Sequence, residues 1–409
     1  MAGAQPPAAA AVPRVSGLRR YGGLSFAYFA AIGLFNPYAP LWFQSLGLST
    51  LVIGAISSLQ SWTRIVAPYA WSWWGDHSGR RAELIRLAAA GSLLSSLGLL
   101  GVQGAAPVAL VTALLFIANS GVVPLSEATV AHLLNTAQGM DTTRYARVRV
   151  WGSIGFIVSV TAFGALLQWA GIAIFPAFVA AMNALLLLAA LRLPATRAEI
   201  AHDEPAPPVW PVLRRPEVAW FFASIFFTVL AHTSLYAFFS LYLVSLGYGK
   251  AAVGGLWAVS VAVEIAFFWF QGRWFPLLSP LRWLQLVAVV TLARFVATAG
   301  FGAWAPVLVL AQLTHAVTFA AHHVACISQV HRLFPGRLRG RGQALYTTLG
   351  YGFSGVVGGV GGGWLIGHLG FASVFWAAAV CAALALGCAV LAQRLGGSPA
   401  AGADPAPSP

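Results

Sequence analysis

The sequence consists almost entirely of long apolar segments separated by short polar loops. A helix needs roughly 20 mostly apolar residues to cross the hydrocarbon core of a bilayer. Lipid offers the backbone no hydrogen-bond partners, so only helices and closed β-barrels span a membrane. The segments here are continuously apolar rather than alternating. Charged residues make up 8% of the chain, whereas soluble proteins carry roughly 25%. The sequence therefore predicts an all-α membrane protein.

Twelve apolar segments can be delimited, six on each side of the longest polar stretch, which is rich in proline. They run over residues 22–46, 50–74, 84–104, 107–134, 149–169, 172–193, 218–246, 251–271, 283–303, 306–333, 343–367 and 371–393. Composition also separates the two ends of the chain from the helical regions. The predicted organisation is an N-terminal segment 1–21, a bundle 22–193, a linker 194–217, a second bundle 218–394 and a disordered tail 395–409.

The two halves of the sequence resemble each other at an offset of 200 residues. The residues Leu41, Ser45, Leu46, Gly47, Gly54 and Ile65 recur as Leu241, Ser245, Leu246, Gly247, Gly254 and Ile265. The match includes a Ser-Leu-Gly turn after the first predicted helix of each half. Repeated halves are typical of transporters, which bind solute near the bilayer midplane between them. The sequence thus predicts twelve transmembrane helices in two pseudo-symmetric six-helix bundles.

The net charge of +13 indicates membrane topology rather than a nucleic-acid partner. Of the 23 lysines and arginines, 20 lie at the termini and in one set of alternate loops. The exceptions are Arg64 and Arg294, inside helices, and Lys250, in the opposite set of loops. Cytoplasmic loops are enriched in Lys and Arg. Both termini are therefore predicted to be cytoplasmic, in a multi-pass protein of the inner membrane.

The loop after the second predicted helix resembles the signature of the major facilitator superfamily, G-x-L-A-D-R-x-G-R-R. It spans residues 72–81 and departs from the signature at Ser72 and His77. The residues that fit, and that the resemblance assigns to a conformational gate, are Asp76, Gly79, Arg80 and Arg81. Glycine permits a tight turn. The resemblance implies that Asp76 pairs with an arginine across the cytoplasmic face in the outward-facing state.

Four further segments, at residues 36–42, 119–128, 144–156 and 342–346, are similar to the phenylpropionate permease family. More distantly, they resemble the lactose permease and nucleoside–proton symporter group. The resemblance implies the major facilitator fold and proton-coupled uptake of a small organic solute, such as an aromatic carboxylate. Oligosaccharide or nucleoside symport, and export by the same fold, are the alternatives. The expected partners are the solute, protons and membrane lipid, and the expected state is a monomer.

Charged groups inside the predicted helices suggest how protons are coupled. Such groups are costly in lipid and often functional. Glu264 and Arg64 are equivalent under the repeat, so we expect them to interact near the midplane, with Arg294 close by. The spacing of His315 and His322 corresponds to two helical turns, which predicts a shared face. A carboxylate that changes arginine partners would bind and release a proton. The alternatives are a static clamp between the halves and histidines that merely pack.

Glu127 and Arg149 resemble the acid–base pair that holds sugar hydroxyls in the lactose permease. Residues of the first and seventh helices line the cavity in this superfamily, and an arginine can also bind a carboxylate through two hydrogen bonds. The predicted substrate-binding residues are Asn36, Tyr38, Glu127, Arg149, Trp151, His232 and Tyr236. The alternative is that Glu127 and Arg149 are gate residues that help only the conformational cycle.

The chain is not expected to be an enzyme or to bind a cofactor or metal. It lacks a Walker-type phosphate loop, and the adjacent His322 and His323 point in different directions on a helix. The G-x-S-G at residues 352–355 matches intramembrane serine proteases, but their smaller fold lacks two repeated halves. The three cysteines lie in apolar segments and suggest no disulfide framework. A transporter-like sensor or a lipid flippase is a further alternative, although the linker is short for a sensor.

Overall fold

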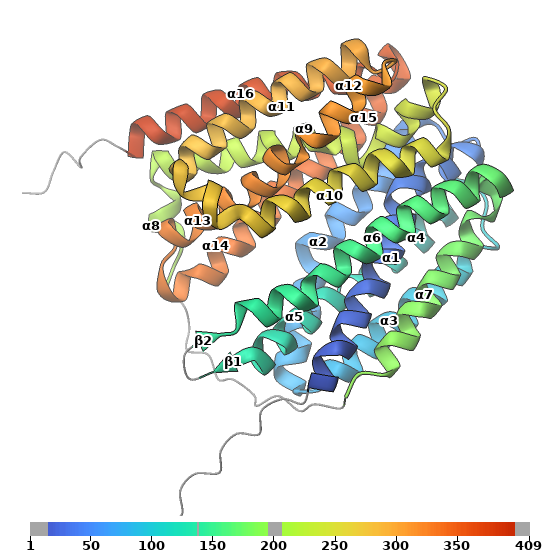
Figure 1. Cartoon of the computed structure of the whole chain (residues 1–409), viewed down its shortest axis with the longest axis horizontal. Helices are drawn as coiled ribbons and strands as arrows, with labels where there is room; N and C mark the ends of the chain where they lie inside the picture. Colours follow the sequence, from blue (N-terminus) through green and yellow to red (C-terminus); the bar gives the residue numbers. More distant parts are fainter. Residues whose placement is uncertain (1–14, 137–138, 195–206, 397–409) are drawn as a thin grey trace, which may run out of the picture.

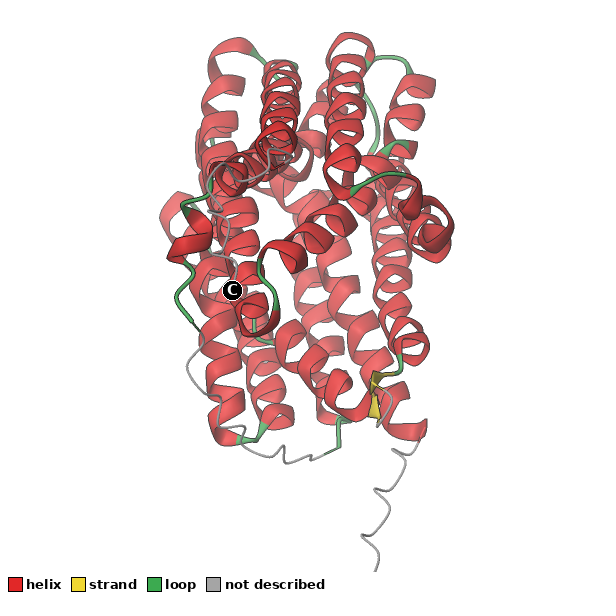
Figure 2. Ribbon diagram, turned by 90° about the vertical axis from the view of Figure 1, so that its left-hand side faces the viewer, coloured by secondary structure: helices red, strands yellow, loops and turns green. Residues whose placement is uncertain are grey.

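Helices account for almost every residue of the computed structural model, which describes residues 15–136, 139–194 and 207–396 (Figures 1 and 2). The first half comprises α1 (Val15–Ser45), α2 (Thr50–Ser78), α3 (Arg81–Gly98), α4 (Ala105–Asn119), α5 (Val122–Leu134), α6 (Thr142–Ala170), η1 (Ile172–Ile174) and α7 (Phe175–Leu191). A short antiparallel hairpin of β1 (Asn135–Thr136) and β2 (Gly139–Met140) joins α5 to α6.

The second half begins after the linker. It comprises α8 (Trp210–Leu213), α9 (Pro216–Ser245), α10 (Lys250–Trp274), η2 (Phe275–Leu277), α11 (Pro280–Phe301), α12 (Ala305–Leu313), η3 (Ala316–Ala321), α13 (His322–Leu333), η4 (Gly336–Leu338), α14 (Arg339–Leu345), η5 (Tyr346–Phe353), α15 (Ser354–Leu369) and α16 (Ser373–Gly396). Both η3 and η5 are π-helices, whereas η1, η2 and η4 are 3₁₀ turns.

Several of these elements join end to end into longer helical stretches. The pair α4–α5, the series α12–η3–α13 and the series α14–η5–α15 each form one stretch. Counted in this way, the described residues contain twelve stretches long enough to cross a bilayer or nearly so. Eight of them are individually long and apolar enough to span a membrane. Among the other four, α3 has 18 residues and carries Arg81, Glu83 and Arg86.

Helices extend beyond the predicted apolar segments on the side where the linker lies. The stretch α6 begins at Thr142 instead of residue 149, and Asp141 caps it by accepting a hydrogen bond from the Arg144 backbone N–H at 3.0 Å. Hydropathy marks where lipid ends, whereas a helix continues as long as its backbone bonds are satisfied. Arg149 therefore lies well inside a helix. Half of the predicted linker 194–217 and most of the predicted tail 395–409 fall outside the described residues.

The repeated Ser-Leu-Gly turns have the same conformation in both halves. Gly47 and Gly247 adopt left-handed φ values of 77° and 88°, which favour glycine. Ser45 and Ser245 each donate a side-chain hydrogen bond of 2.7 Å to the carbonyl three residues earlier. The predicted pseudo-symmetric pair of six-helix bundles is confirmed, and the first helices of the two halves end in the same way.

The two halves touch closely at the ends of the helices remote from the linker, which we call the opposite side. There α2 crosses α15, and a Cβ at Gly54 would overlap the Gly359 carbonyl. The repeat-related contact lies between α6 and α10, where a Cβ at Gly254 would overlap the Val160 carbonyl. Glycine lets helices approach to backbone contact. These two crossings close the opposite side.

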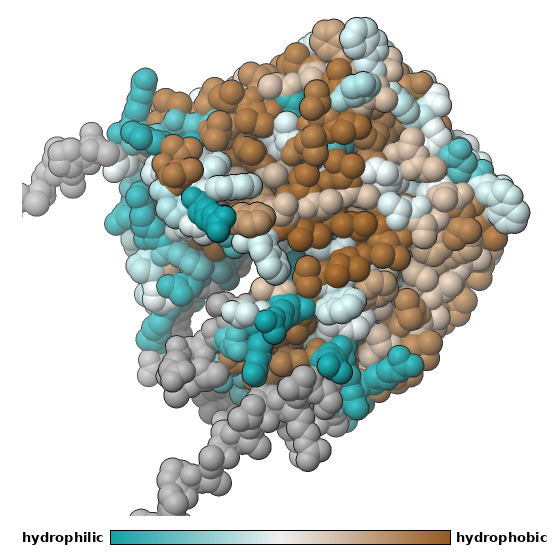
Figure 3. All heavy atoms as spheres, in the orientation of Figure 1, coloured by the Kyte–Doolittle hydropathy of each residue, from teal (hydrophilic) through white to brown (hydrophobic). Residues whose placement is uncertain are grey.

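The halves separate toward the ends of the helices that carry α8 and the β1–β2 hairpin, which we call the linker side. The ribbons of the two halves diverge there (Figure 1), and the surface is hollowed between them (Figure 3). The charged side chains of Arg64 on α2 and Arg149 on α6 are exposed. The molecule is therefore open to the linker side and closed to the opposite side.

Candidate functional site

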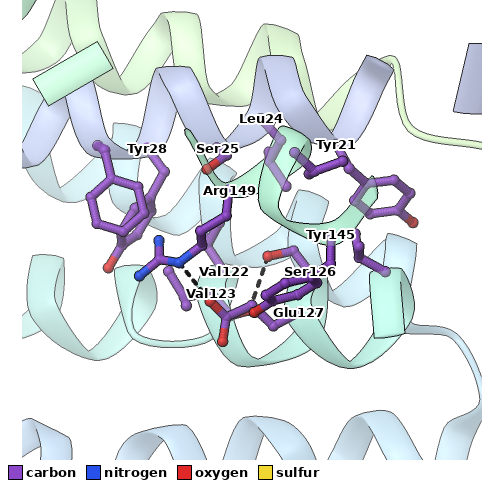
Figure 4. Close-up of a pocket in the computed structure, with 13 residues that line it drawn as sticks. Tyr21, Leu24, Ser25, Tyr28, Val122, Val123, Ser126, Glu127, Tyr145 and Arg149 are labelled. Atoms are coloured by element: carbon purple, nitrogen blue, oxygen red, sulfur yellow. Dashed lines mark hydrogen bonds and ion pairs between the residues drawn. The ribbon is translucent and has the colours of Figure 1, made fainter. Parts of the chain in front are cut away.

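The first wall of the cavity carries an ion pair between α5 and α6. Glu127 lies seven residues before the end of α5, and Arg149 lies seven after the start of α6, so the intervening hairpin brings them level. Arg149 Nε lies 3.5 Å from Glu127 Oε1 (Figure 4). The guanidinium also lies over the Phe29 ring, 4.9 Å from its centroid. The pair is predicted from the sequence, and the stacking on Phe29 is not.

A small pocket beside this pair is lined by α1, α5 and α6. Tyr28 of α1 and Tyr145 of α6 flank the ion pair, together with Ser25 and Ser126 (Figure 4). The space for a guest is about 30 Å³, enough for only a few water molecules, each of which needs about 10–15 Å³. An organic solute must therefore lie in the wider cavity, with the pair at its wall. Sequence reasoning missed both tyrosines, because only their packing across α1 and α6 reveals them.

Arg64 lies on α2, in the same wall. It is exposed, although it sits in the middle of a spanning helix. Together with Arg149 and Glu127, its charge acts on the Tyr28 hydroxyl, so these groups face one region. No carboxylate lies within ion-pair distance of Arg64 among the residues that the structure describes. This wall therefore carries an excess positive charge.

The second wall of the cavity presents Glu264 of α10. Its carboxylate Oε2 lies 3.9 Å from Nε2 of His315. Behind His315, Arg294 is fully buried on α11. Its NH1 donates to His315 Nδ1 at 3.1 Å and to the Thr318 hydroxyl at 2.7 Å. Its NH2 donates to the Gln312 side-chain oxygen at 2.8 Å. Glu264 and Arg294 are thus linked through one imidazole.

The predicted interaction between Arg64 and Glu264 is not a direct ion pair in this conformation. Within the described parts of the chain, the ion-pair partner of Glu264 is His315, and Arg64 is not in contact with it. The two positions are equivalent under the repeat, but α2 packs against α15 while α10 packs against α6. The repeat therefore places the residues on opposite walls. The charges of both still act on the Tyr236 hydroxyl between them.

The predicted spacing of two helical turns between His315 and His322 does not hold. The six-residue π-helix η3 lies between them, and a π-turn holds more residues than an α-turn. Seven residues therefore do not complete two turns. His315 points to Glu264 and Arg294, whereas His322 Nε2 contacts Sγ of Cys326 in its own helix at 3.3 Å. His322 is buried, and its hydrogen-bond contact is with Cys326 rather than with Glu264.

Two further predicted substrate-binding residues are fully buried. Tyr38 donates its hydroxyl to the Val160 carbonyl at 2.7 Å, and that of Lys250 lies 3.4 Å away. This places Tyr38 in the α6–α10 crossing of the opposite side, away from the cavity. His232 donates Nδ1–H to the Thr228 carbonyl at 2.8 Å, which leaves its buried Nε2 without a partner among the described residues.

The remaining predicted substrate-binding residues are more accessible. Trp151 is exposed and packs its edge against Gly22 of α1. Tyr236 is partly buried, and its ring stacks on that of Trp257 with centroids 6.3 Å apart. Asn36 is partly buried on α1. Tyr236 and Trp151 therefore lie in different halves of the molecule, on α9 and α6.

The signature loop between α2 and α3 is built as a local turn. Gly79 has a φ of 65° and ends α2, donating its N–H to the Gly75 carbonyl at 3.0 Å. Asp76 pairs with Arg81 at 2.7 Å, and Arg80 pairs with Glu83. The predicted pairing of Asp76 across the two halves concerns an outward-facing state. With the linker side open, that prediction stays untested.

A two-walled cavity between repeated six-helix bundles, closed on one side of the membrane, defines a membrane transporter rather than an enzyme. The sequence profile of the MFS_1-like family matches residues 18–377, and the chain belongs to that family of the major facilitator superfamily. The predicted fold and superfamily are thereby confirmed. At the described positions no cluster of three or more His, Cys, Asp or Glu residues suited to a metal ion occurs.

Two relatives have similar sequences. The chain is 27% identical over 367 residues to a protein of Escherichia coli (strain K12) named "Probable 3-phenylpropionic acid transporter", covering 87% of this chain and 93% of that protein. It is also 27% identical over 377 residues to the maltose permease of Geobacillus stearothermophilus, covering 87% and 89%. The structure of a variant of the nucleoside transporter NupG matches with a TM-score of 0.77 at 16% identity, covering 92% and 99%.

Proposed function

We propose that the protein takes up a small organic anion together with a proton by alternating access. The observation that carries this proposal is the excess positive charge on the first wall. Arg64 has no ion-pair partner among the described residues, and the only carboxylate on this wall, that of Glu127, is paired with Arg149. Uncompensated arginines are costly at this depth. An anionic solute would supply the missing negative charge, and a guanidinium suits a carboxylate because it can donate two parallel hydrogen bonds.

The aromatic residues near these arginines favour an aromatic carboxylate. Phe29 and Tyr28 lie beside Arg149, and Tyr236 of the second wall lies within the electrostatic reach of Arg64. Aromatic rings contribute large apolar contact areas with directional preferences. The name of the Escherichia coli relative, "Probable 3-phenylpropionic acid transporter", agrees with this class.

Glu264 is proposed as the group that carries the proton. It faces the cavity from the second wall with a neutral imidazole as its neighbour rather than an arginine. Protonation would remove its negative charge and make the second wall more attractive to an anion. Loading one proton and one monoanion would leave the net charge of the cavity unchanged. That balance lowers the cost of moving the loaded site through the closed state.

A sugar is the second candidate substrate, and one observation favours it. Glu127 and Arg149 form a donor–acceptor pair 3.5 Å apart that could hold a hydroxyl group from both sides. The relative named maltose permease agrees with that reading. A neutral sugar would leave the charge of Arg64 uncompensated, which is why we favour the anion.

The linker side is proposed to be cytoplasmic, in the inner membrane. Basic residues gather there, at the ends of α2, α6 and α14 and around α8, as the positive-inside rule requires. The cavity would then be open to the cytoplasm, and both termini would be cytoplasmic. A monomer is sufficient, because the two walls of the site come from one chain.

Uptake by purified protein in liposomes tests substrate and coupling together. Labelled 3-phenylpropionate, 3-phenylpropanol, maltose and a nucleoside would be compared with and without an acid-outside pH gradient. Liposomes without protein correct for passive entry of the uncharged acid. We expect only 3-phenylpropionate to accumulate, and a protonophore to abolish the accumulation. Uptake of maltose or the nucleoside, without competition from 3-phenylpropionate, would contradict the substrate class. Accumulation that is independent of the gradient would contradict coupling.

A further inference from the structure

The buried guanidinium of Arg294 has an unusual set of partners for a charge inside a spanning helix. Its hydrogen-bond acceptors are His315, Thr318 and Gln312, all of them neutral or able to be so. No carboxylate is in ion-pair contact with it in the described ranges. A buried charge is costly unless it is compensated. The nearest compensation runs through His315 to Glu264.

The partners of the imidazole determine which of its nitrogens carries the proton. Arginine has only N–H donors, so Nδ1 of His315 must accept the hydrogen bond from Arg294 NH1. A neutral imidazole then carries its proton on Nε2, the atom that faces Glu264 at 3.9 Å. His232 is in the opposite tautomer, because its Nδ1 donates to a backbone carbonyl. The tautomer of His315 is thus set by Arg294.

We infer that Arg294 is a positioning residue that acts on Glu264 through His315, holding an Nε2–H donor ready for the ionised carboxylate. This inference rests on the proposed role of Glu264 in proton transfer. The distance of 3.9 Å exceeds that of a hydrogen bond, and a shift of about 1 Å would form one. A change in the rotamer of the Glu264 side chain can supply a shift of that size. Arg294 then sets the direction of the donor without becoming a partner of the carboxylate.

The backbone and a neighbouring ring hold the imidazole in this orientation. His315 directly precedes η3, whose wider turn separates its direction from that of His322. Phe319, four residues later, stacks on the imidazole with centroids 5.1 Å apart and planes inclined by 5°. A flip of the imidazole, which would interchange the positions of its two edges, requires the ring to break its stacking on Phe319. The π-helix therefore has a role: it turns one histidine toward the carboxylate and the other away.

Other titratable or charged groups face Glu264 from the surrounding helices. They are Tyr236 of α9, His315 before η3, Tyr351 of η5 and Arg149 of α6, and the charge of Arg64 of α2 acts on the same two tyrosines. His232 of α9 and Arg294 of α11 lie close to His315. The arginines of α2 and α6 belong to the other wall and move relative to Glu264 as the halves rock. His315 belongs to the same half as Glu264 and keeps its place, so it can serve the carboxylate in both states.

Two amide substitutions separate the two functions of the imidazole. The side-chain amide of glutamine at position 315 lies near the position of Nε2 and can donate a hydrogen bond to Glu264. The shorter amide of asparagine lies near the position of Nδ1, so it can only accept the hydrogen bond from Arg294. We expect His315→Gln to retain gradient-driven accumulation within about twofold and His315→Asn to lose about tenfold, the size of a hydrogen bond to a charged group. Exchange at equal concentrations should persist in both. Equal losses in the two variants would overturn the inference.

A spectroscopic measurement tests the tautomer without relying on transport. In protein with ¹⁵N-labelled histidine, the signals absent from His315→Asn identify His315, and we expect them to show a protonated Nε2 and a bare Nδ1. Arg294→Gln should abolish that preference, while the matched control His322→Asn should preserve it. A protonated Nδ1 in the unmodified protein would refute the inference. If the tautomer is as expected but Glu264→Gln still couples to protons, the proposed function fails and the positioning role of Arg294 stands.

Discussion

Both walls of the cavity carry acidic and basic side chains, but these side chains are exposed on the first wall and largely buried on the second. On the first wall, the side chains of Arg149 and Glu127 are 49% and 42% exposed. On the second, Glu264 and His315 are 20% and 5% exposed, and Arg294 is 2% exposed. An exposed ion pair is worth about 0–1 kcal/mol, so a solute can replace it easily. A buried network is held in place by its partners. The comparison suggests that the first wall binds and the second couples.

Removing the charge of the second wall should produce the largest effect. Glu264→Gln resembles the protonated state permanently, so we expect exchange of labelled substrate to persist while gradient-driven accumulation disappears. A gradient of one pH unit supplies about 1.4 kcal/mol, or about a tenfold accumulation for one proton. That factor should fall to unity in the variant. Counterflow and gradient-driven uptake in the same liposomes provide the two measurements.

The matching change on the first wall is the control for that prediction. Glu127→Gln removes a carboxylate from the exposed pair, and accumulation should remain, although affinity changes. If Glu264→Gln still concentrates substrate, the coupling carboxylate lies elsewhere and Glu127 is the next candidate. If both variants accumulate normally, the two walls do not differ as proposed, and facilitated diffusion replaces symport.

A change of the first wall should weaken binding by a smaller factor. Arg149→Ala removes a charged hydrogen-bond donor to the solute, worth about 1.5–3 kcal/mol, which corresponds to at least about a tenfold increase in Kd. At saturating substrate, exchange should remain close to that of the unmodified protein. Binding of labelled 3-phenylpropionate to purified protein measures the effect. Arg147→Ala is the matched control, because Arg147 is exposed on the same helix but points in another direction. Equal losses in both variants would make the effect non-specific.

The fold was predictable from the sequence because lipid imposes a simple rule on it. Long apolar segments, the offset of 200 residues and the distribution of basic residues together predict twelve helices in two bundles. The first-wall pair of Glu127 and Arg149 was also accessible, since both residues stand out as charges in apolar helices. Boundaries on the linker side were predicted less well. Basic residues there continue the helices into a region that hydropathy treats as loop.

The second wall could not be predicted in detail, because its geometry depends on a change of helical register. The residues Ala316–Ala321 give no sequence signal that marks η3 as a π-helix. That one change turns His322 away from Glu264 and leaves His315 facing it. Tyr38 was misjudged for a related reason. The face of α1 that meets α10 depends on how the halves are tilted, which the spacing of residues does not reveal.

The smallest expected effect concerns the contact that would close the cavity on the linker side. Along the α2–α15 crossing, the Ser61 side chain lies against Gly355, and that of Ile65 against Gly352. Eleven residues further along α2 is Asp76, and eleven residues back from Gly352 is Arg341. If the same helix register continues when the linker side closes, Asp76 and Arg341 will lie opposite each other. In the open state Asp76 pairs with Arg81, and Arg341 donates to the Pro207 carbonyl at 2.8 Å.

We therefore expect Asp76→Asn to favour the state open to the linker side. An exposed ion pair of about 0–1 kcal/mol corresponds to at most about a fivefold slowing of turnover, and the Kd for substrate should be unchanged. Counterflow rates and equilibrium binding measure the two quantities. Glu83→Gln is the matched control, because it breaks the neighbouring pair with Arg80, which lies within one turn of helix. Equal losses of binding and turnover in Asp76→Asn would mean that the residue only supports the local turn. An unchanged rate would mean that closure of the two walls does not depend on this pair.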